Sequence, residues 1–458
     1  MSQSITKASD VQIQHFKNVV LKPAQRLRGE IEIPPDKSIA HRAVFLNGLA
    51  DGEAEITNFL EGVDTRDSLH SLKNLGVGIH YEPHVRVMIR GIGANGLTES
   101  PEVLDVGTSA TTMRFLLGLV APEPILTIIT GTDRTRQRPM ERITNPLQQM
   151  GATVFGRKNG QFAPLAIYGG DLQGIHYTSE VSSGEVKTSL LLAGLRAKRG
   201  ITCIETPLAS RDHTERMLKA MGATIHVEEN GCRVSVEPMS KPLSPINMRI
   251  PGEISAAVYW IVLGLVHPDS DITIKSVCVN PSRTGLFDVL KKMGADMEII
   301  PHPGNNLEPI ADIRVRSSRL NGTVVSPELY PRMADEFPGF ALAAALAEGE
   351  TVIQGADDLR NKKTNRIADV VEEYRKLGAI AHETKDGMRF EGCNRLKGAH
   401  CTSHGDHRLG NSLAAAALVA TGETYLENTL PITKTSYPTF WSQVQRVCGP
   451  DAIVRFDQ

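Results

Sequence analysis

A triplet of a hydrophobic residue, glycine and a small residue recurs six times along the 458-residue chain. The copies are Leu75-Gly76-Val77, Met150-Gly151-Ala152, Met221-Gly222-Ala223, Met293-Gly294-Ala295, Leu377-Gly378-Ala379 and a weaker Cys448-Gly449-Pro450. Successive glycines lie about 70 to 85 residues apart, a period too long for a solenoid repeat. Each triplet ends a segment with a helical pattern, so its glycine is expected just after the helix, where a left-handed residue is needed.

A short strand is expected after these triplets, as at 153–155, 224–227 and 297–300. A helix followed by such a strand, once in every period, indicates a small β-α-β-α-β-β unit. Three such units can bury their helices in one globular domain. Six units therefore predict an α/β protein of two domains.

Proline and glycine at the ends of predicted segments suggest where the domains divide. The division falls at Pro34-Pro35 and near Ile250-Pro251-Gly252. One predicted domain is discontinuous, 1–35 plus 253–458, and the other, 36–252, is inserted into it. Two crossings of this kind suit closure over a ligand, and a cleft between the domains is the expected site.

Composition excludes several classes of function. The formal net charge of −2 argues against a nucleic-acid binder that relies on bulk basicity. Six scattered cysteines without a C-x-x-C pair indicate reduced thiols, with neither a disulfide scaffold nor a zinc ribbon. The longest fully apolar run, 256–266, is too short to span a bilayer and predicts a buried helix. With a polar N-terminus that lacks a signal sequence, we expect a cytoplasmic protein without nucleic-acid or membrane partners.

The stretch from Pro34 to Arg42 follows a strand-like run at 30–33 and opens a predicted helix with Ser38 as its N-cap. Lys37 and Arg42 then lie at the positive end of the helix dipole, which disfavours cations unless an anion binds there. From this stretch alone, an anion site and a pair of solvated cations remain equally open.

Cations recur at the predicted helix starts. They are Lys37, Arg42, Arg114, Arg134, Arg136, Arg138, Lys187, Arg211, Lys362, Lys363, Arg366, Arg408 and Lys434. In a chain without net positive charge, this recurrence predicts a shared anionic ligand. We expect Arg136, Arg142, Arg216 and Lys187 to be solvated side chains instead.

Three further stretches have two interpretations each. The Gly/Ser/Thr turn at 107–112 is either an anion cradle or simple N-capping. Asp335 precedes an Ala-rich helix and is either an N-cap or a general base. The G-x-G-x-x-G pattern at 91–96 opens no helix, so a turn is expected there rather than a dinucleotide site.

His404 and His407 lack a third ligand, so a metal site is not expected.

With these residues in place, the chain resembles the 5-enolpyruvylshikimate-3-phosphate synthase family from about residue 21 to residue 456. The motifs Arg211-Asp212-His213-Thr214-Glu215 and Pro281-Ser282-Arg283-Thr284-Gly285 add to this likeness. The resemblance implies a two-domain inside-out α/β barrel with three βαβαββ-type repeats per domain. It also implies a monomeric enzyme, without metal or organic cofactor, that transfers the enolpyruvyl group of phosphoenolpyruvate to a hydroxyl of shikimate 3-phosphate and releases phosphate.

The resemblance also implies roles for single residues. On phosphoenolpyruvate it places Lys37, Ala110, Arg138, Glu185, Arg366, Arg408 and Lys434. On the acceptor it places Ser38, Arg42, Ser183, Glu185, Arg211, Asp335 and Lys362. Asp335 is expected to take the proton of the attacking hydroxyl, while Lys37 or Lys363 helps to deliver a proton to C3 of phosphoenolpyruvate.

Departures from the usual family pattern gather at these positions. They are Thr108 for Asn, Glu185 for Gln, Lys363 for Glu, Leu409-Gly410-Asn411 for Ile-Ala-Met, and Thr435 for Lys with Lys434 adjacent. Glu185 and Lys363 are expected to pair. The acceptor therefore stays open between shikimate 3-phosphate and another phosphorylated hydroxyl compound, such as a nucleotide. A non-catalytic ligand-binding relative is the third alternative. Ala110, where the family usually has Gly, predicts weak inhibition by glyphosate.

Overall fold

The computed structural model describes residues 15–303, 307–362 and 364–457. Its chain splits into two compact units. The inserted unit comprises Pro35–Pro251 and a short segment that ends at Glu308; the discontinuous unit comprises the residues up to Pro34 and those from Gly252 onward, apart from that segment. Within the described residues, no helix is both long enough and apolar enough to cross a membrane.

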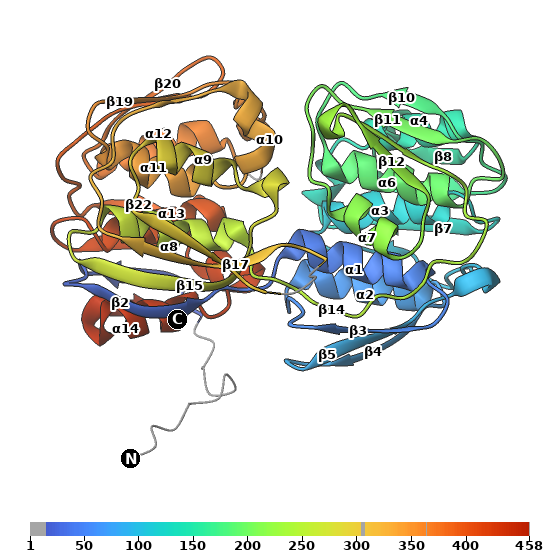
Figure 1. Ribbon diagram of the computed structural model, residues 1–458, viewed down its shortest axis with the longest axis horizontal. Coiled ribbons are helices and arrows are strands. Elements are labelled where there is room, and N and C mark those ends of the chain that lie inside the picture. Colours follow the sequence, from blue (N-terminus) through green and yellow to red (C-terminus); the bar gives the residue numbers. More distant parts are fainter. Residues whose placement is uncertain (1–14, 304–306, 363, 458) are drawn as a thin grey trace. The chain divides into compact units, whose positions relative to one another are not determined.

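The inserted unit is built from four-stranded sheets and helices (Figure 1). Its sheets have the strand orders β14 (Met248–Arg249), β3 (Glu53–Thr57), β5 (Arg86–Arg90), β4 (Gly78–Glu82); β6 (Leu104–Asp105), β7 (Leu126–Thr130), β9 (Phe162–Tyr168), β8 (Thr153–Gly156); and β10 (His176–Thr178), β11 (Thr202–Glu205), β13 (Arg233–Val236), β12 (Ile225–Glu228). Its helices are α1 (Lys37–Leu49), α2 (Val63–Asn74), α3 (Ala110–Val120), α4 (Glu141–Met150), a short α5 (Arg157–Gly160), α6 (Gly184–Leu195) and α7 (His213–Ala220).

The discontinuous unit has the same construction. Its sheets have the strand orders β16 (Met297–Pro301), β17 (Ile310–Arg316), β15 (Ser270–Cys278), β2 (Leu27–Glu32); β18 (Val324–Val325), β19 (Glu350–Ile353), β21 (Met388–Glu391), β20 (Ile380–Glu383); and β22 (His400–Thr402), β23 (Thr424–Glu427), β1 (Asn18–Leu21), β24 (Ile453–Asp457). Its helices are α8 (Ile254–Val266), α9 (Gly285–Lys292), α10 (Tyr330–Met333), α11 (Phe337–Leu346), α12 (Arg366–Lys376), α13 (His407–Ala417) and α14 (Phe440–Cys448).

The predicted repeat is confirmed by the strand pairings. In the sheet of β6 to β9, β6 and β7 are parallel and flank α3, whereas β8 and β9 form an antiparallel hairpin after α4. The other sheets follow the same order, which makes six βαβαββ-type units. The six triplet glycines have φ between 88° and 114°, so the predicted need for glycine after each helix is confirmed as well.

Three strands, which we call borrowed strands, complete sheets whose other strands come from a distant part of the chain. β14, at the end of the inserted segment, pairs in parallel with β3, and β2, which precedes that segment, pairs in parallel with β15. β1 lies between β23 and β24 and completes the last sheet. The N-terminal strands are therefore integral parts of sheets whose other strands come much later in the chain.

Helices lie inside each unit and sheets lie outside, as Figure 1 shows. In the discontinuous unit, α8, α11 and α13 pack against one another and are buried on nearly all sides. The apolar run at 256–266 belongs to α8, so the predicted buried helix is confirmed. In the inserted unit, α1, α3 and α6 are buried in the same way. A buried helix needs no polar face, which explains the continuous apolar run in α8.

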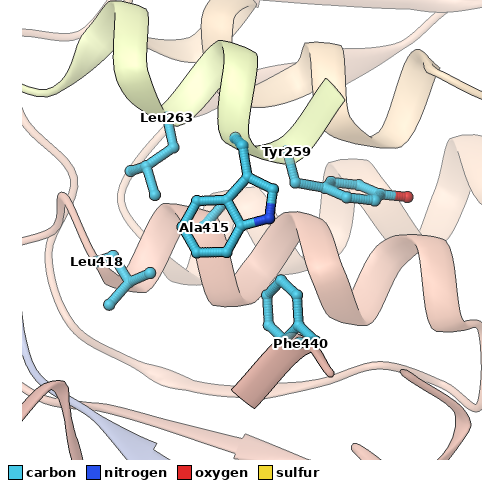
Figure 2. Close-up of a pocket in the computed structure, with 6 residues that line it drawn as sticks. Tyr259, Leu263, Ala415, Leu418 and Phe440 are labelled. Carbon is cyan, nitrogen blue, oxygen red and sulfur yellow. The ribbon is translucent and has the colours of Figure 1, made fainter. Parts of the chain in front are cut away.

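Figure 2 shows a packing gap in the core of the discontinuous unit, between α8, α13 and α14. Its walls include Tyr259, Leu263, Ala415, Leu418 and Phe440. The gap has no room for a water molecule. It is therefore part of the core packing and offers no space for a ligand.

Candidate active site

Helix α1 begins at Lys37, directly after an extended residue, Asp36. Asp36 Oδ1 caps the helix by accepting a hydrogen bond from the Ile39 N–H at 2.9 Å. The prediction of Ser38 as N-cap is therefore wrong by two residues. A carboxylate is favoured here because it also meets the positive end of the helix dipole. The Ser38 hydroxyl instead accepts a hydrogen bond from Arg211 Nη1 at 2.9 Å.

The Lys37 ammonium lies 3.0 Å from Asp64 Oδ2 on α2. Thr108 Oγ1 donates a hydrogen bond to Asp64 Oδ1 at 2.7 Å. Burial acts to raise the pKa of Asp64, but Lys37 and the Thr108 hydroxyl hold this pKa well below its ordinary value. Asp64 is thus ionised at neutral pH and stabilises the cationic form of Lys37.

The turn at 107–112 contains an N-cap, as one of its two predicted interpretations requires; the anion cradle stays a prediction. Ser109 Oγ accepts a hydrogen bond from the Thr112 N–H at 3.1 Å, and α3 begins at the next residue, Ala110. Ala110 is half-buried, at the first position of the helix. Its methyl group therefore lies beside backbone N–H groups that have no partner within the helix.

Arg42 is nearly fully buried, with 2% of its surface exposed. Its guanidinium donates hydrogen bonds to the Ser38 carbonyl at 2.9 Å, to Thr214 Oγ1 at 2.8 Å, and to the Gly184 carbonyl and Thr188 Oγ1, both at 3.1 Å. All these acceptors are neutral. The positive charge of Arg42 therefore lacks an ionised hydrogen-bond partner among them, as expected where an anion binds.

Ser38, Arg42, Ser183 and Arg211 make up what we call the acceptor cluster, all in the inserted unit. Ser183 caps α6, where its Oγ accepts a hydrogen bond from the Val186 N–H at 3.4 Å. Burial and the nearby Arg211 lower the pKa of Arg42 to about 10, so Arg42 remains charged at neutral pH. The structure brings together two cations and two hydroxyls, a set suited to carboxylate and phosphate groups.

Glu185, at the start of α6, forms an ion pair with Arg114 and accepts a hydrogen bond from Thr111 Oγ1 at 2.6 Å. Burial acts to raise the pKa of Glu185, but Arg114 and Thr111 hold it well below its ordinary value. Burial and Arg114 lower the pKa of the half-buried Arg138. The expected partner of Glu185, Lys363, lies outside the described residues, so that pairing stays a prediction; the ion pair with Arg114 was not predicted. An acidic residue at a helix start beside a recurring cation was the available signal.

In the discontinuous unit, Arg366 and Arg408 meet at Asp335. Asp335 Oδ1 lies 3.5 Å from Arg366 Nη1 and 3.5 Å from Arg408 Nε. Arg366 Nε also donates to Asp406 Oδ2 at 2.7 Å, and Arg408 Nη2 to Glu253 Oε1 at 3.2 Å. We call Asp335, Arg366 and Arg408 the arginine cluster.

The charges of this cluster stabilise one another. Burial acts to lower the pKa of both arginines, but Asp406 raises the pKa of Arg366, and Asp335 and Glu253 raise that of Arg408. The side chain of Asp335 is 21% exposed, whereas those of the arginines are 4% and 9% exposed. Asp335 is thus the member of the cluster that a solute reaches most easily.

Asp335 is not the N-cap of α11, because Glu336 occupies that position. The Glu336 side chain is fully buried and accepts hydrogen bonds from Arg283 Nη2 at 3.0 Å and from Ser255 Oγ. This buried pair fixes the chain next to Asp335. The N-cap interpretation of Asp335 is therefore wrong.

The remaining predicted lysines are less constrained. Lys362 Nζ lies 2.5 Å from Asp358 Oδ2, and Asp358 also accepts a hydrogen bond from the Tyr330 hydroxyl at 2.8 Å. Lys434 is exposed on the turn Ile432–Ser436. Lys363 lies outside the described residues.

Comparison with known proteins identifies the family. The family model "EPSP synthase (3-phosphoshikimate 1-carboxyvinyltransferase)" matches residues 21–444. The chain belongs to the EPSP synthase family. A 3-phosphoshikimate 1-carboxyvinyltransferase of Herpetosiphon aurantiacus is 46% identical over 93% of this chain and 98% of its own, and one of Desulforudis audaxviator is 47% identical over 92% and 97%. The solved EPSP synthase of Acinetobacter baumannii superposes with a TM-score of 0.85 at 34% identity, over 94% of this chain and 98% of its own.

In this member of the EPSP synthase family, the predicted exposure of Lys187 is wrong. It was expected to be a solvated side chain, but it is 2% exposed and forms an ion pair with Glu215. Arg136 and Arg216 are partly exposed and pair with Asp133 and Asp212. The burial of Lys187 was missed because its partner lies on a different helix, α7, which no local pattern indicates.

Two groups of side chains place possible metal ligands within 4.8 Å of one another. They are His176, Cys203 and Glu205, and Glu372, Glu373 and His404. In each group a basic side chain already pairs with a carboxylate: Arg233 Nε lies 3.2 Å from Glu205 Oε1, and Lys376 Nζ lies 2.6 Å from Glu373 Oε1. We therefore assign neither group to a metal in this EPSP synthase family member.

His41 on α1 makes the stability of the protein sensitive to acid. Its imidazole is buried, and Nδ1 lies 2.8 Å from Ser68 Oγ. Burial, and then the charge of Lys37, lower the pKa of His41 to about 3, although Asp64 and Glu185 act to raise it. Between pH 6.5 and pH 3 the unfolded chain binds a proton that the folded protein excludes. The stability that neutral His41 contributes is therefore fully present above pH 6.5. As the pH is lowered from 6.5 towards 3, the free energy of unfolding decreases by up to about 1.4 kcal/mol per pH unit.

We expect His41→Asn to make the free energy of unfolding depend less steeply on pH between pH 6.5 and pH 4. Urea unfolding at a series of pH values measures this slope, with His80→Asn as the control because His80 is exposed. An unchanged slope in His41→Asn would show that another group causes the acid sensitivity.

Proposed function

We propose that this chain is a 1-carboxyvinyltransferase that transfers the enolpyruvyl group of phosphoenolpyruvate to a hydroxyl of shikimate 3-phosphate and releases phosphate. The observation that carries this proposal is the contact of Asp335 with two buried arginines, Arg366 and Arg408. It places a partly exposed carboxylate, the expected base, beside the two cations expected to bind an anionic substrate. Membership of the EPSP synthase family supports the reaction type.

Three arginines have proposed roles toward phosphoenolpyruvate. Arg138 neutralises the phosphate, and Arg366 and Arg408 bind the carboxylate through charge-assisted hydrogen bonds. The other residues proposed to contact this substrate are Lys37, Ala110, Glu185 and Lys434. Because preformed cations need no rearrangement when negative charge develops, they stabilise the transition state more effectively than water does.

The acceptor cluster has the complementary role. Ser38 and Arg42 bind the carboxylate of shikimate 3-phosphate, and Ser183 and Arg211 bind its phosphate. The further residues proposed on the acceptor are Glu185, Asp335 and Lys362. The hydrogen bond between Arg211 and Ser38 supports this grouping, because it joins a residue proposed for the phosphate to one proposed for the carboxylate.

The proposed reaction has two steps. Asp335 takes the proton of the acceptor hydroxyl, whose oxygen attacks C2 of phosphoenolpyruvate while a cationic acid, Lys37 or Lys363, supplies a proton to C3. A tetrahedral ketal phosphate results. Loss of a proton from C3 with cleavage of the C2–O bond to phosphate then leaves the enol ether and inorganic phosphate. Lys37 Nζ lies 3.0 Å from Asp64 Oδ2, which places a carboxylate beside this proposed acid.

Phosphate release tests the proposal. Phosphoenolpyruvate is supplied with shikimate 3-phosphate and, separately, with a panel of nucleotides. The expected result is that phosphate is released when the acceptor is shikimate 3-phosphate and not when it is a nucleotide. Release with a nucleotide instead would assign another acceptor, and saturable phosphoenolpyruvate binding without release would indicate a binding protein.

We propose that the protein acts in the cytoplasm as a monomer, with domains 1–35 plus 253–458 and 36–252. The two compact units and the free thiols of the six cysteines support this organisation and location.

We also propose that Ala110 makes the protein insensitive to glyphosate. Ala110→Gly is expected to strengthen glyphosate inhibition by about 10- to 200-fold, the range for one methylene in a binding pocket. The inhibition constant measures this, with Ala220→Gly at the exposed end of α7 as the matched control. An unchanged inhibition constant in Ala110→Gly would remove the explanation.

A further inference from the structure

The first turn of α7 is fixed by buried contacts to three different parts of the chain. His213, Thr214 and Glu215 are consecutive and have exposed fractions of 0%, 0% and 5%. His213 contacts Glu308, Thr214 contacts Arg42 on α1 and Thr188 on α6, and Glu215 contacts Lys187 on α6. Arg211 of the acceptor cluster lies two residues before this turn. The contacts of the turn therefore fix the position of the Arg211 backbone.

Glu308 is the unexpected member of this set. It lies between β16 and β17, which belong to the discontinuous unit, yet Glu308 itself belongs to the inserted unit. It is 2% exposed, and its Oε1 lies 2.8 Å from His213 Nδ1, which has no exposed surface. Burying a carboxylate and an imidazole together is costly unless they pair. The reaction proposed above has no use for Glu308.

We propose that Glu308 is a positioning residue for the acceptor cluster. Its carboxylate fixes the orientation of the His213 imidazole and so the first turn of α7. That turn holds Thr214 Oγ1 at 2.8 Å from Arg42 Nε and Arg211 Nη1 at 2.9 Å from Ser38 Oγ. The inference rests on the proposed function, because it takes these residues to bind shikimate 3-phosphate.

The chemistry at this position favours an acid. The N-terminal turn of a helix carries partial positive charge, which a carboxylate stabilises. A carboxylate also accepts the hydrogen bond of the imidazole more strongly than a neutral amide does. Glu308→Gln keeps the size of the side chain and removes its charge, whereas Glu308→Ala removes both.

The effect should be selective for the acceptor. For the full-length Glu308→Ala protein we expect KM for shikimate 3-phosphate to rise about 10- to 100-fold, as for a displaced binding group. KM for phosphoenolpyruvate should stay within about twofold of wild type, because the arginine cluster is unchanged. Glu308→Gln should show the same selectivity with a smaller rise.

The control variant is His302→Gln. His302 lies in the same connection between β16 and β17, and the substitution removes its 2.7 Å contact with Asp312 of β17. A general loosening of this connection would affect His302→Gln and Glu308→Gln alike. Equal changes in the two KM values of Glu308→Gln, or none, would overturn the inference even if Glu308→Ala fails to fold.

Direct binding separates this inference from the proposed function. The dissociation constant of shikimate 3-phosphate is measured by calorimetry without phosphoenolpyruvate, for wild type, Glu308→Gln and His302→Gln. Absence of turnover in the wild type would overturn the proposed function. Weaker binding by Glu308→Gln than by His302→Gln would still support the positioning role, and equal binding would overturn it.

Discussion

Asp335→Asn is expected to lower kcat by about 10²- to 10⁴-fold, the usual contribution of a general base. Asn cannot accept the hydroxyl proton, but it nearly keeps the shape of Asp. KM for phosphoenolpyruvate should not rise, because Arg366 and Arg408 lose a competing negative charge. Stability should change little, because Arg366 still pairs with Asp406 and Arg408 with Glu253. Steady-state kinetics of phosphate release, together with urea unfolding, measure both effects.

Asp406→Asn is the informative comparison. Asp406 is fully buried, caps α13 and pairs with Arg366. Removing its charge should weaken phosphoenolpyruvate binding and destabilise the protein, because Arg366 would lose its buried partner.

If Asp335→Asn keeps more than half of the wild-type kcat, Asp335 is not the base.

Lys187→Met is expected to lower the free energy of unfolding by about 3 to 5 kcal/mol, the cost of leaving one partner of a buried ion pair uncompensated. Glu215 would keep its negative charge in a place where it is 5% exposed. Lys187→Met combined with Glu215→Met should recover much of the loss, because two apolar side chains replace the pair. Urea unfolding curves of both variants test this pattern.

Lys198→Met is the control for the same change at the surface. Lys198 pairs with Asp171, and both side chains are well exposed, at 68% and 80%. An exposed pair contributes little to stability, so Lys198→Met should unfold like wild type. A double variant that is no more stable than Lys187→Met would mean that the lysine acts through its hydrocarbon stem rather than its charge.

The repeat made the fold predictable. A glycine with positive φ after a helix leaves a local trace in the sequence, and so does a helix buried on all sides, such as α8. The strands borrowed from distant segments left no such trace. β14 consists of two residues, Met248 and Arg249, and its place beside β3 is a long-range contact.

The candidate site was predictable to the extent that its residues stand at helix starts or in family motifs. Arg366 and Arg408 do, and they meet at Asp335 within one unit. The partners that hold such residues were not predictable, because they come from other helices. Arg114 for Glu185 is one example. Ser38 shows a second limit: two capping residues compete near the start of α1, and the carboxylate of Asp36, two positions earlier, is the one that caps the helix.

The borrowed strands also fix an order of events on the ribosome. β1 and β2 are synthesised before the inserted segment, but their partners β23 and β15 are synthesised only after it. The nascent chain must therefore carry two unpaired, partly apolar strands while the sheets of the inserted unit, one of which β14 completes, are already able to form. Synthesis of β24 completes the sheet to which β1 belongs.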